Sequence, residues 1–167
     1  MKEQLIVSGI GGQGVLFLTR VIAQAAVDRG LPVLTAETHG MAQRGGTVLS
    51  TIKVGDFHSP LVRAGQGDVA LLLWEANLPV HRGLLKPTGA LFVNAAETGE
   101  GRRLDATALA RELGNPVLSN LILLGLALRD GALFCGVADC EAAIRALAPP
   151  KFVEQNLAAL RVGLAAA

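Results

Sequence analysis

The 167-residue chain is poor in aromatic and charged residues. It contains no Tyr, and its aromatic residues amount to 4%. Charged residues make up 17%, against the ~25% that is usual in soluble domains. With a formal net charge of +1, and neither a basic stripe nor stacking aromatics, the chain does not resemble a nucleic-acid binder. The low charge leaves two explanations open, a well-filled core or a large apolar face for a partner.

Cysteines, histidines and long apolar runs are also scarce. Cys135 and Cys140 cannot supply the four ligands of an iron–sulfur cluster or a structural zinc ion. The three histidines show no ligand spacing, so we expect no metal on this chain. No run reaches the ~18 apolar residues of a membrane span, and the N-terminus lacks the pattern of a signal peptide. We therefore expect a cytoplasmic protein without a membrane or nucleic-acid partner.

Short apolar segments bounded by turn residues predict about five strands. They are residues 4–10, 31–37, 47–55, 68–75 and 89–95. Because no helix precedes residues 47–55, we expect that strand to be antiparallel or at an edge. Helical spacing and caps predict the helices, at residues 13–29, 76–86, 105–113, 120–129, 139–147 and 151–164.

The order of these elements predicts the fold class. We expect an α/β fold: a Rossmann-like three-layer sandwich with a mostly parallel sheet and helices on both faces. No linker or repeat interrupts the chain, so residues 1–167 are expected to form a single domain. Asp105 and Asp139 are expected to cap the helices that they open.

The glycine-rich turn GIGGQG connects the first strand to the first helix and matches Gly-x-Gly-x-x-Gly. Gly9 is expected to turn with positive φ, Gly11 to let a ligand approach the backbone, and Gly14 to seat the helix close to the sheet. The helix N-terminus would attract an anion. A dinucleotide site also needs an acid after the second strand, where only Glu37 is available, and it lies late. A bound nucleotide and a purely structural turn both stay open.

A polar, glycine-rich loop, residues 38–46, follows the second strand and is expected at the same sheet edge as the glycine turn. Arg44 is its only guanidinium and suits phosphate or carboxylate. Gln13 is expected to orient an amide or backbone group, and Glu37 to pair with His39. The alternative is that these groups only satisfy one another and a partner's backbone. The candidate site residues are Gly9, Gly11, Gly12, Gln13, Gly14, Glu37, His39, Gln43, Arg44, Gly45 and Gly46.

Six segments in order carry a resemblance to a known family: GIGGQGV (9–15), ETHGMAQRGG (37–46), VLSTIKVG (48–55), GDVALLLWE (67–75), NLILLGLAL (120–128) and KFVEQNLAALRVG (151–163). Together they resemble the gamma subunit or gamma domain of 2-oxoacid:ferredoxin oxidoreductases. The HGMAQRGG form is most similar to the beta subunit of the indolepyruvate ferredoxin oxidoreductases. The resemblance covers nearly the whole chain and agrees with the Rossmann-like prediction.

The resemblance implies an accessory subunit in a complex that oxidatively decarboxylates indolepyruvate or other aryl 2-oxoacids to acyl-CoA and CO2, with ferredoxin as acceptor. Such complexes use thiamine diphosphate, Mg²⁺ and [4Fe-4S] clusters. Thiamine enzymes hold the diphosphate through Gly-Asp-Gly, whereas Gly55–Asp56 and Gly67–Asp68 here are not followed by glycine. We therefore expect these cofactors on a large thiamine/iron–sulfur partner subunit and none on this chain.

At the junction with that partner, the glycine turn and the loop 38–46 could contact the diphosphate end of coenzyme A, which is a better candidate there than NAD. Ferredoxin would be reached only through the complex. The isolated chain is expected to be inactive, and either to self-associate or to expose an apolar patch. Two alternatives remain open at this stage: a free-standing NAD-binding Rossmann oxidoreductase, and a nucleotide-binding module without chemistry.

Overall fold

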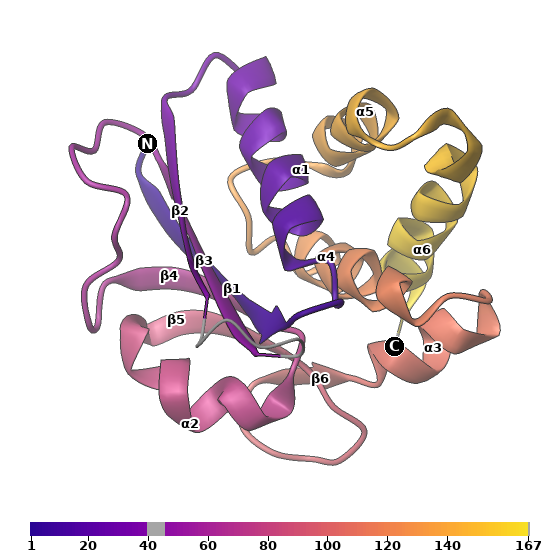
Figure 1. The fold of residues 1–167 in the computed structure, drawn as a ribbon. Helices are drawn as coiled ribbons and strands as arrows, with labels where there is room; N and C mark the ends of the chain where they lie inside the picture. The colour runs from indigo at the N-terminus through magenta and orange to yellow at the C-terminus, as the bar shows by residue number, and fades with distance from the viewer. Residues whose placement is uncertain (40–45, 167) are drawn as a thin grey trace.

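A computed structural model describes residues 1–39 and 46–166 and shows six strands in one twisted sheet (Figure 1). They are β1 (Glu3–Ile10), β2 (Val33–His39), β3 (Thr47–Val54), β4 (Gly67–Leu72), β5 (Leu85–Asn94) and β6 (Arg102–Leu104). Their order across the sheet is β2-β3-β1-β4-β5-β6. The pairs β1–β4, β4–β5 and β5–β6 are parallel, which confirms the mostly parallel sheet.

Strand β3 is antiparallel to both of its neighbours, as expected, but it lies inside the sheet between β2 and β1 and not at an edge. The prediction also missed β6, whose three residues include two arginines and lack an apolar run. The elements β1, α1 (Val15–Asp28) and β2 thus form a strand–helix–strand unit, and β3 lies between its two strands.

The helices agree with the predicted positions to within a few residues. They are α1 (Val15–Asp28), α2 (Leu78–His81), α3 (Ala106–Glu112), α4 (Ser119–Arg129), α5 (Val137–Leu147) and α6 (Val153–Ala165). The helix predicted over 76–86 is shorter than expected, because α2 is a single turn between two 3-10 turns. Asp105 caps α3 through the N–H of Ala108 as predicted, whereas Asp139 lies inside α5 and accepts from the N–H of Gly136.

Helices cover the two faces of the sheet unequally (Figure 1). Along β1, Leu5 and Val7 point into a large core with the buried faces of α1, α4, α5 and α6, whereas Ile6 points to the other face. That second face has a small core and is covered by α2 and the segment 55–66, so we call it the thin face. The third layer of the sandwich is therefore present but slight.

Close helix packing completes the large core. Gly125 and Gly163 let α4 and α6 approach backbone to backbone, because a Cβ on either glycine would overlap the other helix's backbone. None of the helices in the described ranges is both long and apolar enough to cross a membrane.

Candidate functional site

The glycine turn lies at the carboxyl end of β1, where the sheet reverses its winding direction between β1 and β4. Its left-handed residues are Gly12 (φ +91°) and Gly14 (φ +74°), and Gly14 is the N-cap of α1. Gly9 does not have the expected positive φ. It is instead needed for close packing, because a Cβ there would lie 2.8 Å from both Gln13 Oε1 and Val15 Cγ2. Gly14 was expected to let the helix pack close to the sheet. A Cβ there would instead contact Asn120 on α4 and Val117 just before it.

The Gln13 side chain joins the glycine turn to the neighbouring strand. Its Oε1 accepts from the N–H of Ile10 (2.9 Å), and its Nε2 donates to the carbonyl of Leu73 (2.9 Å), directly after β4. The N–H of Leu73 donates in turn to the carbonyl of Ser8 (2.7 Å). Gln13 therefore orients backbone, one of its two expected roles. It also spans the crevice between β1 and β4, in which open α/β sheets hold their cofactors.

Three asparagines support the same turn from other elements. Asn120 on α4 donates to the carbonyl of Gly14 (3.1 Å), and Asn77 donates to the carbonyl of Gly9 (2.9 Å). Asn94, at the end of β5, donates to the carbonyl of Leu73 (3.1 Å), which Gln13 also uses. All three asparagines are buried. The turn is thus held in one conformation by side-chain amides, which the sequence analysis did not identify.

A buried hydroxyl and imidazole extend this network onto the thin face. The Ser8 hydroxyl lies 2.7 Å from Nδ1 of His81 on α2 and accepts from Asn77 (3.0 Å). Burial lowers the pKa of His81 below its ordinary value, which favours the neutral imidazole. Since Ser8 has no exposed surface, the pair fastens α2 to the sheet and is not accessible as a nucleophile and base.

The end of the second polar loop reaches the glycine turn as predicted. The N–H of Gly11 donates to the carbonyl of Gly46 (3.0 Å), and Ile10 is paired with Thr47 across the sheet. Gln43, Arg44 and Gly45 lie outside the described residues. The N–H of Gly11 is therefore engaged by protein backbone.

Glu37 and His39 were predicted to lie beside the glycine turn, but a whole strand separates them from β1. Both are on β2, and β3 separates β2 from β1 by two strand spacings, about 10 Å. Glu37 is exposed and pairs with Ser50, level with Val7 and not with the turn. The backbone of His39 is level with Gly9. Glu37 was predicted as a member of the candidate site, but it does not reach the glycine turn, because β3 lies between β2 and β1.

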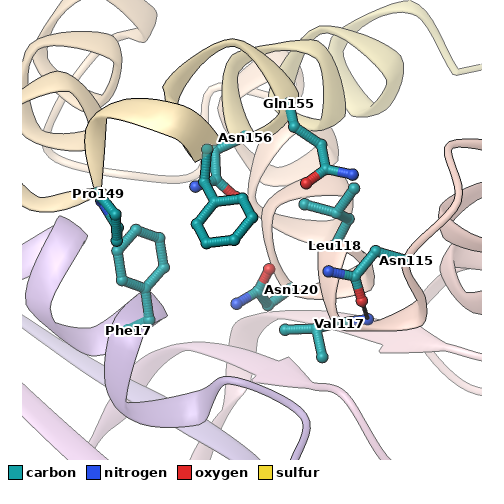
Figure 2. A pocket seen from close by; sticks show the side chains of 9 residues that line it. Phe17, Asn115, Val117, Leu118, Asn120, Pro149, Gln155 and Asn156 are labelled. Carbon is teal, nitrogen blue, oxygen red and sulfur yellow. Dashed lines mark hydrogen bonds between the residues drawn. The ribbon is translucent and has the colours of Figure 1, made fainter.

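Hollows flank the turn on both sides. One of about 290 Å³ is lined by Ile10, Gly11, Gly12, Gly14, Val15, Leu16 and Val48. A second, of about 200 Å³, lies between the starts of α1, α4 and α6 (Figure 2). Figure 2 shows Phe17 on one wall and the amides of Asn120, Gln155 and Asn156 around the space. A third, of about 330 Å³, lies over the ends of β4 and β5 beside Trp74 and Asn94.

Large apolar side chains are exposed beside these three hollows. We call them the carboxyl-edge rim: Leu16, Trp74, Val117 and Phe152, which are 39–44% exposed. Scattered exposed apolar residues need no explanation, but four that line adjoining hollows at one sheet edge are typical of an interaction surface.

The described residues do not match a thiamine or iron–sulfur site. Asp68 accepts from Lys86 and from the N–H of Gln4, so its carboxylate is already bound. Cys135 and Cys140 are buried, with their Sγ atoms 3.7 Å apart. The contact with Cys135, together with burial, raises the pKa of the Cys140 thiol. Within residues 1–39 and 46–166, no three His, Cys, Asp or Glu side chains gather as metal ligands.

The chain is similar to proteins of known class over nearly its full length. Residues 4–166 match the pyruvate ferredoxin/flavodoxin oxidoreductase family. The indolepyruvate oxidoreductase subunit IorB of Archaeoglobus fulgidus is 31% identical over 98% of this chain and 94% of its own. The subunit of the same name from Thermococcus kodakarensis is 29% identical over 100% and 97%.

Solved structures agree with the fold. The gamma subunit of a keto/oxoacid ferredoxin oxidoreductase from Geobacter sulfurreducens matches with a TM-score of 0.79, 25% identity and coverage of 98% of this chain and 99% of that chain. A 2-oxoglutarate:ferredoxin oxidoreductase from Magnetococcus marinus, solved with 2-oxoglutarate, coenzyme A and succinyl-CoA bound, has a TM-score of 0.77 at 19% identity. That match covers 98% of this chain and 30% of that chain, and it shows a shared fold.

The contact at Gly14 gives a first test. Gly14→Ala is expected to lower the free energy of unfolding by about 2–4 kcal/mol, because the new methyl group adds overpacking against Asn120 to left-handed backbone strain. Gly12→Ala is the matched control. Gly12 also has a positive φ, but no atom of residues 1–39 and 46–166 lies within 4 Å of the new Cβ, so this variant should lose only about 1–2 kcal/mol. Urea unfolding of both variants measures the difference, and equal losses would show that Asn120 does not restrict this position.

Proposed function

The chain belongs to the pyruvate ferredoxin/flavodoxin oxidoreductase family as a subunit of a 2-oxoacid:ferredoxin oxidoreductase, and from this we propose its substrate and its role. The complex oxidatively decarboxylates indolepyruvate or a related aryl 2-oxoacid to acyl-CoA and CO2, with ferredoxin as acceptor. The observation that carries the substrate class is the full-length similarity to two proteins named indolepyruvate oxidoreductase subunit IorB. The family's reaction and its subunit nature agree with the expectation from the sequence motifs.

Within that complex, this chain is the accessory subunit. The reasons are that the carboxylate of Asp68 is already bound to Lys86, that both cysteines are buried, and that no three His, Cys, Asp or Glu side chains gather among the described residues. We assign thiamine diphosphate, Mg²⁺ and [4Fe-4S] clusters to a large partner subunit. When bound there, they supply the carbanion chemistry and the electron transfer to ferredoxin.

The carboxyl edge of the sheet is the surface that we assign to the partner. It combines the rim residues, Phe152 and Trp74 among them, with a turn that four side-chain amides hold rigid. A rigid turn presents its backbone to a partner without an additional ordering cost. Of the predicted site residues, Gly11, Gln13 and Gly46 lie at this junction and are joined there by hydrogen bonds.

Coenzyme A is the small molecule that we place at the junction, with its phosphates toward the N-terminus of α1 and Arg44. Among the described residues, no atom lies within 4 Å of a Cβ built on Gly12, so these residues leave the hollow beside Gly11 and Gly12 open. A helix N-terminus favours phosphate, and a guanidinium binds it through two hydrogen bonds.

The geometry of the glycine turn argues against the alternative of a free-standing NAD-dependent enzyme. Gln13 bridges the crevice that a dinucleotide would enter. A ribose-binding acid lies at the end of the strand next to β1, whereas β3 separates the strand of Glu37 from β1. The same geometry argues against a nucleotide-binding module of the ordinary Rossmann type.

The substrate proposal is tested by co-expressing the chain with the large subunit and assaying a panel of 2-oxoacids under anaerobic conditions. We expect kcat/KM for indolepyruvate and phenylpyruvate to exceed that for pyruvate and 2-oxoglutarate by at least about 100-fold, because a missing aryl ring forfeits several methylene equivalents of burial. A preference for pyruvate or 2-oxoglutarate would contradict the proposal, and NAD reduction by the isolated chain would contradict the accessory role.

The docking surface is tested separately by subunit association. Phe152→Ser is expected to weaken association about tenfold or more, as loss of an apolar anchor does at an interface. Leu61→Ser is the control, since Leu61 is 60% exposed and lies in the segment over the thin face. Association measured by interferometry should be unchanged for Leu61→Ser, and equal effects in both variants would remove the carboxyl edge as the docking surface.

Arg44 tests the coenzyme A assignment. Arg44→Ala should leave the complex assembled and raise the KM for coenzyme A about tenfold, because a charge-assisted hydrogen bond contributes about 1.5–3 kcal/mol. Arg129→Ala is the control, at the far end of α4 from the turn. Unchanged coenzyme A kinetics in an intact Arg44→Ala complex would exclude this role.

A further inference from the structure

A further hollow, lined mainly by polar side chains, lies at the opposite end of the sheet from the glycine turn and from the three hollows described above. It measures about 390 Å³ and is lined by Gln4, Lys53, Arg63, Ala64 and Gln66. Gln4 is near the amino end of β1, and Lys53 is its direct partner on β3, so the two side chains lie next to each other on the thin face. This hollow shares no lining residue with those around the glycine turn.

Lys53 is the unusual residue of this hollow, because a lysine that is only 8% exposed normally has a carboxylate partner. In the part of the chain that the structure describes, no carboxylate lies within ion-pair distance of Lys53 or Arg63. The carboxylate of Asp68, on the strand beside Gln4, is bound by Lys86 and the N–H of Gln4. The Lys53 ammonium lies 5.0 Å from the centre of the Phe57 ring, and Lys2 shares that ring at 4.9 Å.

A fixed turn carries the second cation into the hollow. The N–H of Gln66 donates to the carbonyl of Arg63 (3.1 Å), which closes the turn and keeps the two side chains together. The N–H of Gly65 donates to the carbonyl of Gly83 (2.8 Å), and Val62 is buried in the core of the thin face. Arg63 and Gln66 are thus held at a defined place over Lys53.

The stem of Lys53 is packed against its neighbours, and its ammonium has no carboxylate partner among the described residues. The attraction of the Phe57 ring replaces only part of such a partner. We infer that this hollow is a binding site for a small phosphate-like oxyanion, with Lys53 and Arg63 as charged ligands and Gln4 and Gln66 as amide donors. Two cations match the double charge of phosphate, and Arg63 suits its paired oxygens. The site is independent of the proposed junction, so it is tested without enzymatic activity.

The test titrates the full-length chain with sodium phosphate at constant ionic strength, and follows backbone amides by two-dimensional NMR. Saturable shifts are expected at residues 4, 53 and 63–66, and sodium chloride should not reproduce them. Lys53→Met keeps the packing of the alkyl stem and removes the charge, and Arg63→Gln changes an exposed turn position that does not endanger folding. Each variant should weaken phosphate binding about tenfold, the loss of one charge-assisted hydrogen bond.

Arg111→Gln is the matched control, since it removes one exposed positive charge on α3. It should leave the phosphate affinity unchanged. Shifts that grow linearly with phosphate, or that the Arg63→Gln variant retains at full affinity, would overturn the site. If Lys53→Met proves unstable, Arg63→Gln alone decides between these outcomes.

Discussion

The hydrogen bonds of Gln13 hold together the part of the structure on which its function depends. The side chain connects the N–H of Ile10 to the carbonyl of Leu73, and so it closes the crevice between the two strands at which the sheet reverses its winding direction. Because Asn94 donates to the same carbonyl, the ends of β1, β4 and β5 are fixed relative to one another. A Rossmann-like turn is thereby converted from an open cofactor crevice into a rigid surface.

A rigid surface of this kind explains the distribution of apolar residues around it. Side-chain amides satisfy the backbone of the turn from inside, while Leu16, Val117 and Phe152 remain exposed around it. In a free-standing enzyme such exposure would have no benefit. In a subunit it places apolar side chains on a surface with few unsatisfied polar groups, the composition that the core of a protein interface has. The low charge content of the chain has the same explanation, in addition to a large core.

Local sequence patterns predicted most helices and strands. The order of the strands and the roles of the buried amides depend on tertiary contacts, which local patterns do not encode. The apolar stripe of α1, from Val15 to Ala26, is buried as its spacing indicates. The glycines of residues 9–14, where the predicted strand meets the predicted helix, located the turn. The place of β3 between β2 and β1 depends on pairing between distant strands, which no local spacing encodes. The roles of Asn77 and Asn120 were missed for the same reason, since each amide is remote in sequence from the carbonyl that it binds.

The unequal covering of the sheet separates the two polar ends of the molecule. Five helices bury one face, so the thin face and its short loops are where charged side chains can reach the sheet. At the carboxyl end, side-chain amides form hydrogen bonds with the backbone carbonyls of the turn. The surface that remains exposed there is apolar, which suits a protein partner. At the amino end, Lys53 and Arg63 line one hollow and have no carboxylate partner among the described residues, which suits an anion. The two ends therefore differ because one has satisfied its polar groups internally and the other has not.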